Sequence, residues 1–492
     1  MVDPGTRRNM VTYYLNFIVV AAVGFVINPL LLSALGPLMF GMWKSLQRYL
    51  DFATVADGRA SQALKWVVAS RLTLSDEERR RDVGAAIIVW IRWLPAAALV
   101  AAGITVALPQ LVKGIPTDAR SVAYTAAAIL AANAVLAGLL SVPDSVLVGV
   151  NQAYKSTLVI TGFFVVSNGA MIVVALSGWP LWSLAAIVFA AAVANGTVTL
   201  LVAKRAVPWW GVARPTALDL RRVHRYSALT LGWGVVERLF ISCELIVISV
   251  MLGAVVVTQY TFTSYVMQFV ITISAITASA FMPKLGANIG ASEIPAAAEM
   301  ARSIRHLVIG ITMLGSGAVL AFNGAFVTLW VGGDQFLGTT LNGLFVVLGL
   351  QLALIRMDGQ ILDVTMRIAP KVLAGLFSSV GGVAAGCLGF ALSQDLVVAL
   401  TSVIALRLGS NVAFPWLVAR SIPIPAVPWR PVLLGLALVA FSFSIGPSIQ
   451  NNELPLRAAL VLGWVILAGA AAWCGLVPRT AVRALLIRPG SP

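Results

Sequence analysis

The chain has 492 residues, of which 59% are hydrophobic and only 11% are charged, and its mean hydropathy is +0.93. Soluble domains carry about 25% charged residues, so this composition excludes a soluble globular protein and indicates a chain that crosses the membrane many times. The formal net charge of +15 would suggest a nucleic-acid partner in a soluble chain, but here it is explained by Lys and Arg in cytoplasmic loops. We therefore expect no nucleic-acid partner.

Residues for metal-bound or redox chemistry are scarce. The chain has three Cys and two His, and they stand singly, without the spacing of metal ligands. The sequence therefore predicts no metal site, no cofactor and no catalytic residue, and we expect that the protein is not an enzyme.

Apolar runs of membrane length predict fourteen spans. They cover roughly 10–33, 38–64, 85–112, 121–149, 153–177, 181–203, 227–252, 254–283, 306–331, 335–356, 370–392, 395–419, 431–449 and 456–477. With the N-terminus in the cytoplasm, most Lys and Arg residues outside the spans fall on the cytoplasmic side, and only Lys113, Arg120 and Arg457 fall on the other. This distribution predicts that both termini are cytoplasmic.

The second predicted span carries more charge than a lipid-facing helix tolerates. Lys44, Arg48, Asp51 and Arg59 fall on one stripe of a helix. Arg48 lies roughly 16 Å beyond Pro37, near the middle of a ~30 Å hydrocarbon core. A charge at that depth costs several kcal/mol unless it faces protein or water. We therefore expect this stripe to line a polar cavity that prefers anions.

Structural alternatives stay open for these residues. Asp51 follows Arg48 at position i+3, so the two can form an intrahelical pair in which Asp51 is the counter-ion. Lys44 is shallow enough to reach toward the interface. Arg59 lies near the cytoplasmic end, where it can anchor the helix or form an entrance for a phosphate head group.

The long basic loop 204–226 predicts a linker between two halves, 1–203 and 227–420, and residues 421–492 add two further spans and a short cytoplasmic tail. The Leu-Gly turn of the first half recurs weakly in the second, an even number of spans later, so the halves would be related by a pseudo-two-fold axis along the membrane normal. The fold class we expect is an all-α polytopic membrane protein with two six-helix lobes around a central cavity.

The second half carries its own charges within predicted spans. Arg238 lies close to the middle of the membrane beside Glu237, so it would meet Arg48 in one cavity if the first, second, seventh and eighth spans face each other. A buried ion-pair network is the alternative. Glu244 is the best candidate for a proton-coupling carboxylate. For Arg407, in the twelfth span, a cavity role and a structural role both stay open.

Resemblance to a known family rests on two segments, RRNMVTYYLNFIVVAAVGFVINPLLLSALGPLMFGMWKSLQRYL (7–50) and VADGRASQAL (55–64). They resemble the Wzx-type polysaccharide flippases, or lipopolysaccharide biosynthesis proteins, of the multidrug/oligosaccharidyl-lipid/polysaccharide exporter superfamily. Such proteins commonly open with an Asn-containing span, a Pro near its end, a Leu-Gly turn, an FGxW motif and an Asp-Leu-Gly-like element. Here the last element reads Asp57-Gly58-Arg59-Ala60, with the Gly displaced and a charge added.

The resemblance implies alternating access and outward movement of a polyprenyl-pyrophosphate-linked oligosaccharide across the cytoplasmic membrane, for cell-surface polysaccharide synthesis. Its expected partners are membrane lipids and the lipid-linked substrate, and a polysaccharide polymerase is a further candidate. In this hypothesis one set of residues binds phosphate groups in the cavity, namely Lys44, Arg48, Arg59, Arg238 and Arg407. A second set serves as coupling groups or counter-ions, namely Asp51, Asp57, Glu237 and Glu244.

Three other functions were weighed against this hypothesis. A cation-coupled drug antiporter of the same superfamily would need cavity carboxylates and usually twelve spans. A flippase for lipid II is a close sibling that the sequence does not exclude. A membrane glycosyltransferase or ligase generally carries its catalytic residues on large outer loops, and the predicted outer loops are all short.

Overall fold

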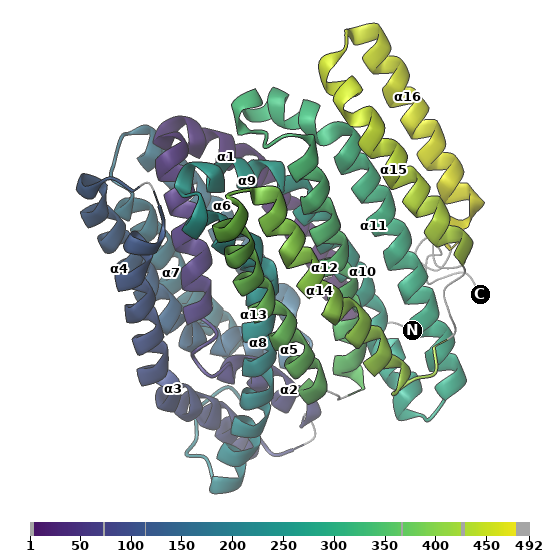
Figure 1. Ribbon diagram of the computed structural model, residues 1–492. Helices are drawn as coiled ribbons and strands as arrows, with labels where there is room; N and C mark the ends of the chain where they lie inside the picture. Colours follow the sequence, from purple (N-terminus) through teal and green to yellow (C-terminus); the bar gives the residue numbers. More distant parts are fainter. Residues whose placement is uncertain (1–3, 72–73, 114, 366–367, 425–428, 479–492) are drawn as a thin grey trace. The chain divides into compact units, whose positions relative to one another are not determined.

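The computed structural model describes residues 4–71, 74–113, 115–365, 368–424 and 429–478. All regular secondary structure in these ranges is helical (Figure 1), which confirms the predicted all-α class. Arg367 and most of the predicted cytoplasmic tail, residues 479–492, lie outside the described residues.

The helices form two compact units. The first contains residues Met1–Arg238 and Leu252–Val257. Its helices are α1 (Pro4–Ala53), α2 (Ala60–Ser70), α3 (Asp76–Leu111), α4 (Thr117–Leu140), α5 (Val142–Gly149), α6 (Ala153–Leu176), α7 (Trp182–Ala206) and the first part of α8 (Ala217–Met251).

The second unit contains Leu239–Met251 and Thr258–Pro492. It holds the rest of α8, the end of α9 (Ala254–Thr263), α10 (Tyr265–Gly290), α11 (Ile294–Val331), η1 (Gly333–Gln335), α12 (Thr339–Val364), α13 (Ile368–Ser393), α14 (Leu396–Ala419), α15 (Trp429–Asn451), α16 (Leu454–Ala471) and the π-helical turn η2 (Ala472–Leu476). The lobe boundaries predicted from the sequence stay a prediction.

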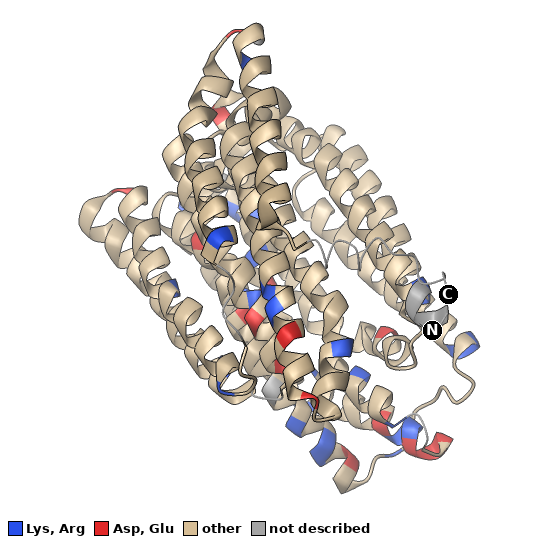
Figure 2. Cartoon of the chain, turned by 90° about the vertical axis from the view of Figure 1, so that its right-hand side faces the viewer, with Lys and Arg blue, Asp and Glu red and all other residues tan. Residues whose placement is uncertain are grey.

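Among the described residues, 12 helices are long and apolar enough to cross a membrane, judged by length and composition. This number differs from fourteen for two reasons. The first predicted span and the second as far as Ala53 belong to one helix, α1, whereas the rest of the predicted second span forms a turn and the start of α2. In addition, α8 is not counted because Glu237, Arg238 and Glu244 interrupt its apolar part. Charged residues are few along the long helices and gather toward their ends, with a further group part-way along (Figure 2).

The break between the first two predicted spans is a kink in α1. Gly36 has φ 72° and ψ 166°, a backbone conformation that glycine adopts without a steric penalty. Pro37 follows, and its fixed φ suits the first residue of a renewed helix. One residue therefore changes the direction of the helix without a loop.

The basic segment between α7 and α8 is held firmly on the first unit. The Trp209 ring is 5% exposed and packs in a core cluster with Val207 and Val223. Arg80 Nε donates to Trp209 O (2.9 Å), and Ala213 N donates to Arg80 O (3.1 Å). This segment, predicted as a linker, is thus fixed to the start of α3.

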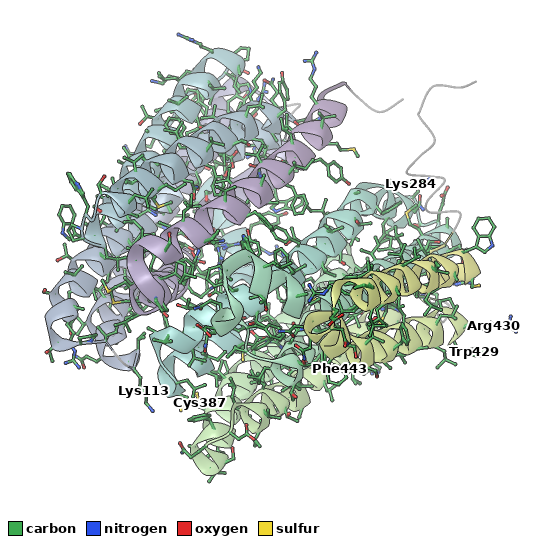
Figure 3. The ribbon with its side chains drawn as sticks, turned by 90° about the horizontal axis from the view of Figure 1, so that it is seen from above. Lys113, Lys284, Cys387, Trp429, Arg430 and Phe443 are labelled. Carbon is green, nitrogen blue, oxygen red and sulfur yellow. The ribbon has the colours of Figure 1, made fainter. Side chains whose placement is uncertain are left out.

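The last two helices pack on the second unit. α15 lies along α11, and Gly446 allows the backbone of α15 to approach Leu320 O of α11. Trp464 of α16 donates its Nε1–H to Ser442 Oγ (2.8 Å). At the start of α15, Arg430 lies over the exposed Trp429 ring (Figure 3), an arrangement typical of a membrane–water interface.

Candidate functional site

Lys44 spans the kink of α1. Its Nζ donates to Asn28 Oδ1 (2.9 Å), and Asn28 Nδ2 in turn donates to Gly24 O (2.8 Å). The same ammonium lies 5.2 Å from the centroid of the Phe40 ring. Among the described residues, no carboxylate lies within ion-pair distance of Lys44. Lys44 therefore ties the two halves of α1 together and keeps its charge uncompensated at short range.

Arg48 lies one turn further along α1 and is half-buried. Its side chain forms no hydrogen bond or ion pair with any residue that the structure describes. Asp51, the partner suggested by helical spacing, instead pairs with Arg238 of α8, whose Nη1 lies 3.3 Å from Asp51 Oδ2. The intrahelical Arg48–Asp51 pair is thus not what the structure contains.

Asp57 shapes the turn between α1 and α2. Its Oδ1 accepts a hydrogen bond from the backbone N–H of Arg59 (2.7 Å), and Gly58 and Arg59 both have positive φ (75° and 50°). Such a side-chain cap is the usual device of Asp in turns. Asp57 is 4% exposed and reaches α4 because Gly138 leaves room for its Oδ2.

The Arg59 side chain turns toward α8. Its guanidinium lies against Gly234, where a Cβ would come within 3.3 Å of Arg59 Cζ. Arg59 is attracted by Glu237 and Asp57 and repelled by Arg238. Arg59, the charge added in this turn, thus interacts with Glu237 of α8.

Lys65 lies one turn into α2. Its Nζ donates to Gln62 Oε1 (2.9 Å), and it interacts electrostatically with Asp144 and Glu237. The first unit therefore collects charges from α1, α2, α5, α8 and the turn before α2. We call this set the cationic cluster: Lys44, Arg48, Arg59, Lys65 and Arg238, with the carboxylates Asp51, Asp57, Asp144 and Glu237. Five basic residues face four acidic ones, and of the five only Arg238 forms an ion pair among the described residues.

Arg407 occupies a different place, in the second unit. It is 1% exposed, its Nη1 lies 2.9 Å from Glu244 Oε1, and its Nη2 donates to Phe240 O (3.0 Å). A weaker bond runs to Leu348 O (3.4 Å). Arg407 is thus a buried clamp between α8, α12 and α14, and its donors are engaged by protein.

Glu244 also borders a small cavity of about 20 Å³ in the second unit. The polar groups that share this pocket are Tyr260, Ser264 and Gln268. The carboxylate therefore has two environments, the Arg407 guanidinium on one side and the pocket on the other.

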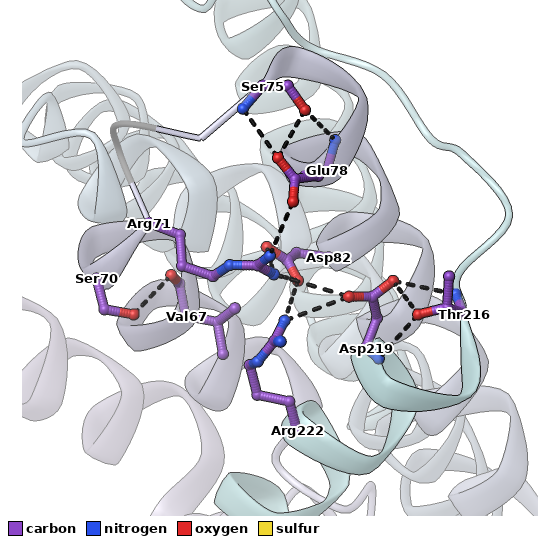
Figure 4. A network of polar contacts seen from close by, with 9 residues as sticks. All are labelled: Val67, Ser70, Arg71, Ser75, Glu78, Asp82, Thr216, Asp219 and Arg222. Carbon is purple, nitrogen blue, oxygen red and sulfur yellow. Dashed lines mark hydrogen bonds and ion pairs between the residues drawn. The ribbon is translucent and has the colours of Figure 1, made fainter.

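The structure contains a second charged network, which the sequence did not predict. Asp82 is fully buried, and its two oxygens accept from Arg71 Nη1 (2.6 and 2.8 Å) (Figure 4). Arg222 bridges Asp82 and Asp219 (3.5 and 3.2 Å). This network joins the end of α2, the start of α3 and the start of α8.

Two capping motifs support this network. Ser75 and Glu78 form a capping box at the start of α3, and Thr216 bonds to Asp219 in the same way at the start of α8. Burial raises the pKa of the Asp219 carboxyl, but the hydrogen bonds from Thr216 and the charge of Arg222 outweigh it and lower the pKa below its usual value. The S-x-x-E pattern at 75–78 and the T-x-x-D pattern at 216–219 were the available sequence signals.

No metal-binding cluster is found in the described part of the chain, where no three His, Cys, Asp or Glu side chains could hold an ion together. The charged groups above can bind anions, exchange ion-pair partners or carry protons.

Comparison with known proteins places the fold. No family model and no curated protein matches the sequence. Among solved structures, the lipid II flippase MurJ in an inward closed conformation has a TM-score of 0.70 at 10% identity, over 98% of this chain and 99% of its own. The Vibrio cholerae MATE transporter VcmN has a TM-score of 0.57 at 16% identity, over 85% of this chain and 97% of its own. A MOP superfamily transporter from Pyrococcus furiosus has a TM-score of 0.56 at 16% identity, over 84% of this chain and 94% of its own. The chain therefore has the same fold as these transporters.

Proposed function

We propose that this chain is a flippase that moves a polyprenyl-pyrophosphate-linked oligosaccharide to the outer leaflet by alternating access. It would reside in the cytoplasmic membrane with both termini inside. The observation that carries the proposal is Arg48, a half-buried guanidinium in a membrane helix with no hydrogen bond or ion pair to any described residue. Such a charge is expensive in hydrocarbon and marks a substrate path by default.

The chemistry of a pyrophosphate fits the cationic cluster. A guanidinium binds phosphate oxygens with two parallel hydrogen bonds, which makes Arg48 and Arg238 suitable partners. The Asp51–Arg238 pair has side chains 39% and 31% exposed, so a ligand can reach it. An arriving phosphate can displace Asp51 from Arg238 at small cost, because exposed ion pairs contribute only about 0–1 kcal/mol.

The fold also supports a flippase over a drug antiporter. The likeness to MurJ extends over 98% of this chain and so includes α15 and α16, whereas the likeness to VcmN covers 85%. An antiporter for cations needs carboxylates open to its cavity, but Glu244, the candidate for proton coupling, is tied to Arg407. The drug antiporter is therefore the weaker proposal.

Lipid II is a second candidate cargo, since the similar flippase carries that name. Lipid II shares the polyprenyl pyrophosphate with other lipid-linked oligosaccharides. The cationic cluster would bind only the pyrophosphate, so it does not distinguish between these cargoes. The distinction is made by depletion of the protein followed by extraction of the lipid-linked sugars. Accumulation of a surface-polysaccharide precursor in the cytoplasmic leaflet supports the first cargo, and accumulation of lipid II supports the second. No change in any lipid-linked sugar contradicts the flippase proposal.

A further inference from the structure

A pocket in the second unit lies between α11, α12 and α14. Its cavity volume is about 190 Å³, below the roughly 300–1,000 Å³ of a pocket for a whole drug-sized ligand, so it suits a small polar group. One part of its wall is polar, with Arg305, Asp358, Ser410 and Asn411. The rest is apolar, with Ile309, Leu354, Ile355, Met357, Phe414 and Pro415. This combination suits an amphiphile.

The polar part contains an ion pair with unused hydrogen-bonding capacity. Arg305 Nε and Nη2 both donate to the same oxygen of Asp358, Oδ1 (2.9 and 2.7 Å). Asp358 is 3% exposed. Among the described residues, none donates to Asp358 Oδ2 and none accepts from Arg305 Nη1. The pair thus offers one acceptor and one donor to a ligand.

Asn411 adds a second unsatisfied acceptor to the pocket. Its Nδ2 donates to Gln351 O (3.1 Å), which fixes the orientation of the amide. Its Oδ1 is buried and has no hydrogen-bond partner among the described residues. Buried polar atoms without a partner are rare in folded proteins, and a bound water, ion or ligand group accounts for them. A ligand that brings N–H or O–H donors would satisfy Asn411 Oδ1.

The neighbouring residues indicate the depth of this pocket in the membrane. Trp416 follows the lining residue Pro415 and is 51% exposed. The Arg420 guanidinium lies 3.7 Å from the centroid of the Trp416 ring. A Trp with a basic residue at the end of an apolar helix marks the head-group level. The pocket thus lies where a phospholipid head group would be.

We propose that this pocket binds the head group of a phospholipid that carries a primary ammonium and a phosphate, the phosphoethanolamine group. The ammonium supplies N–H donors for Asp358 Oδ2 and Asn411 Oδ1, and a phosphate oxygen accepts from Arg305 Nη1. The apolar wall holds the glycerol and the first carbons of the acyl chains. This lipid is a bound partner of the protein, distinct from the proposed cargo.

The test uses the full-length protein in detergent and native mass spectrometry with lipids of identical acyl chains. The lipids are phosphatidylethanolamine, its N-methyl and N,N-dimethyl derivatives, phosphatidylcholine and phosphatidylglycerol. Affinity is expected to fall as N–H groups are replaced by methyl groups, by about tenfold or more from the first lipid to phosphatidylcholine, because hydrogen bonds to charged groups are lost. Equal affinity for these two lipids, or preference for phosphatidylglycerol, would overturn the proposal. Soluble phosphoethanolamine should not compete at equal concentration, and equal competition would overturn the lipid assignment.

Variants separate the polar contact from the shape of the pocket. Asn411→Leu leaves the ion pair intact and should reduce the preference for ethanolamine over choline. Ile309→Phe narrows the pocket and should weaken all lipids alike, which keeps a test available if changes to the ion pair prevent folding. Arg302→Gln is the matched control, because Arg302 pairs with the exposed Glu299 on the same helix (3.2 Å), outside the pocket. An unchanged lipid preference in Asn411→Leu, or unchanged affinity in Ile309→Phe, contradicts the proposal.

Discussion

Arg238 Nη1 lies 3.3 Å from Asp51 Oδ2, although the two residues are 187 positions apart in the chain. The pair joins the end of α1 to α8 within the first unit. It also leaves Arg48, three residues before Asp51, without an ion pair among the described residues. Because Asp51 pairs with Arg238 and not with Arg48, the Arg48 guanidinium is the one that is open to an anion.

The Asp51–Arg238 pair is expected to be an exchangeable contact. Arg238→Ala should abolish transport at normal abundance, because a phosphate ligand is lost while an exposed pair contributes only about 0–1 kcal/mol to stability. The double variant Asp51→Ala/Arg238→Ala should stay inactive. The measurement is transport at matched membrane abundance. Wild-type activity in the double variant would mean that the pair serves structure alone.

Lys44 is expected to act through the kink of α1. Lys44→Met and Asn28→Ala each remove the same hydrogen bond, so their effects on melting temperature should be similar and should not add in the double variant. Only Lys44→Met also removes a charge. Transport that falls equally in both variants supports a positioning role, whereas a loss confined to Lys44→Met would show that the ammonium meets the substrate.

The buried Glu244–Arg407 pair is expected to behave as a structural clamp. Removal of one partner strands a buried charge and should cost about 3–5 kcal/mol, as in Glu244→Gln or Arg407→Met. The double variant Glu244→Leu/Arg407→Met should recover most of this loss. Thermal unfolding of the purified protein measures it, and single variants with wild-type stability would contradict the clamp.

The network at the start of α8 predicts a pH dependence. The pKa of Asp219 is lowered in the folded protein, so the unfolded chain binds more protons there. Its contribution to stability should be complete above the unfolded pKa of about 3.9 and should disappear as the pH falls through the lower folded value. The melting temperatures of wild type and Asp219→Asn should therefore differ at neutral pH and converge at acidic pH. A difference in melting temperature that stays constant from neutral to acidic pH would show that protonation of Asp219 does not control this part of the stability.

Helical periodicity predicted one charged stripe, on α1, but not the partners of its residues on other helices. The stripe with Lys44, Arg48 and Asp51 follows from spacing alone, and the all-α class follows from composition. The bond from Lys44 to Asn28 depends on the angle at Gly36, and the bond from Arg407 to Glu244 joins residues on α14 and α8. Such contacts arise from packing, so spacing left both a cavity role and a structural role open for these residues.

The Asp57 turn shows a similar limit. The sequence has a displaced Gly and an added charge here, a departure from the family pattern at a position expected to be functional. In the structure Gly58 packs beneath Trp93, and Asp57 caps the backbone of Arg59. Gly58 and Arg59 both have positive φ, and this backbone conformation could not be read from the spacing of the residues.

The central claim is that Arg48 holds the pyrophosphate of a lipid-linked oligosaccharide during its passage. The most direct measurement is the distribution of the lipid-linked sugar between the two leaflets in cells that carry Arg48→Ala, at the abundance of the wild-type protein. Arg92→Ala is the control, since Arg92 is an exposed arginine on α3. We predict that Arg48→Ala traps the substrate in the cytoplasmic leaflet, that Arg48→Lys restores transport only in part because an ammonium lacks the guanidinium fork, and that Arg92→Ala has no effect. A wild-type distribution in Arg48→Ala would contradict the account.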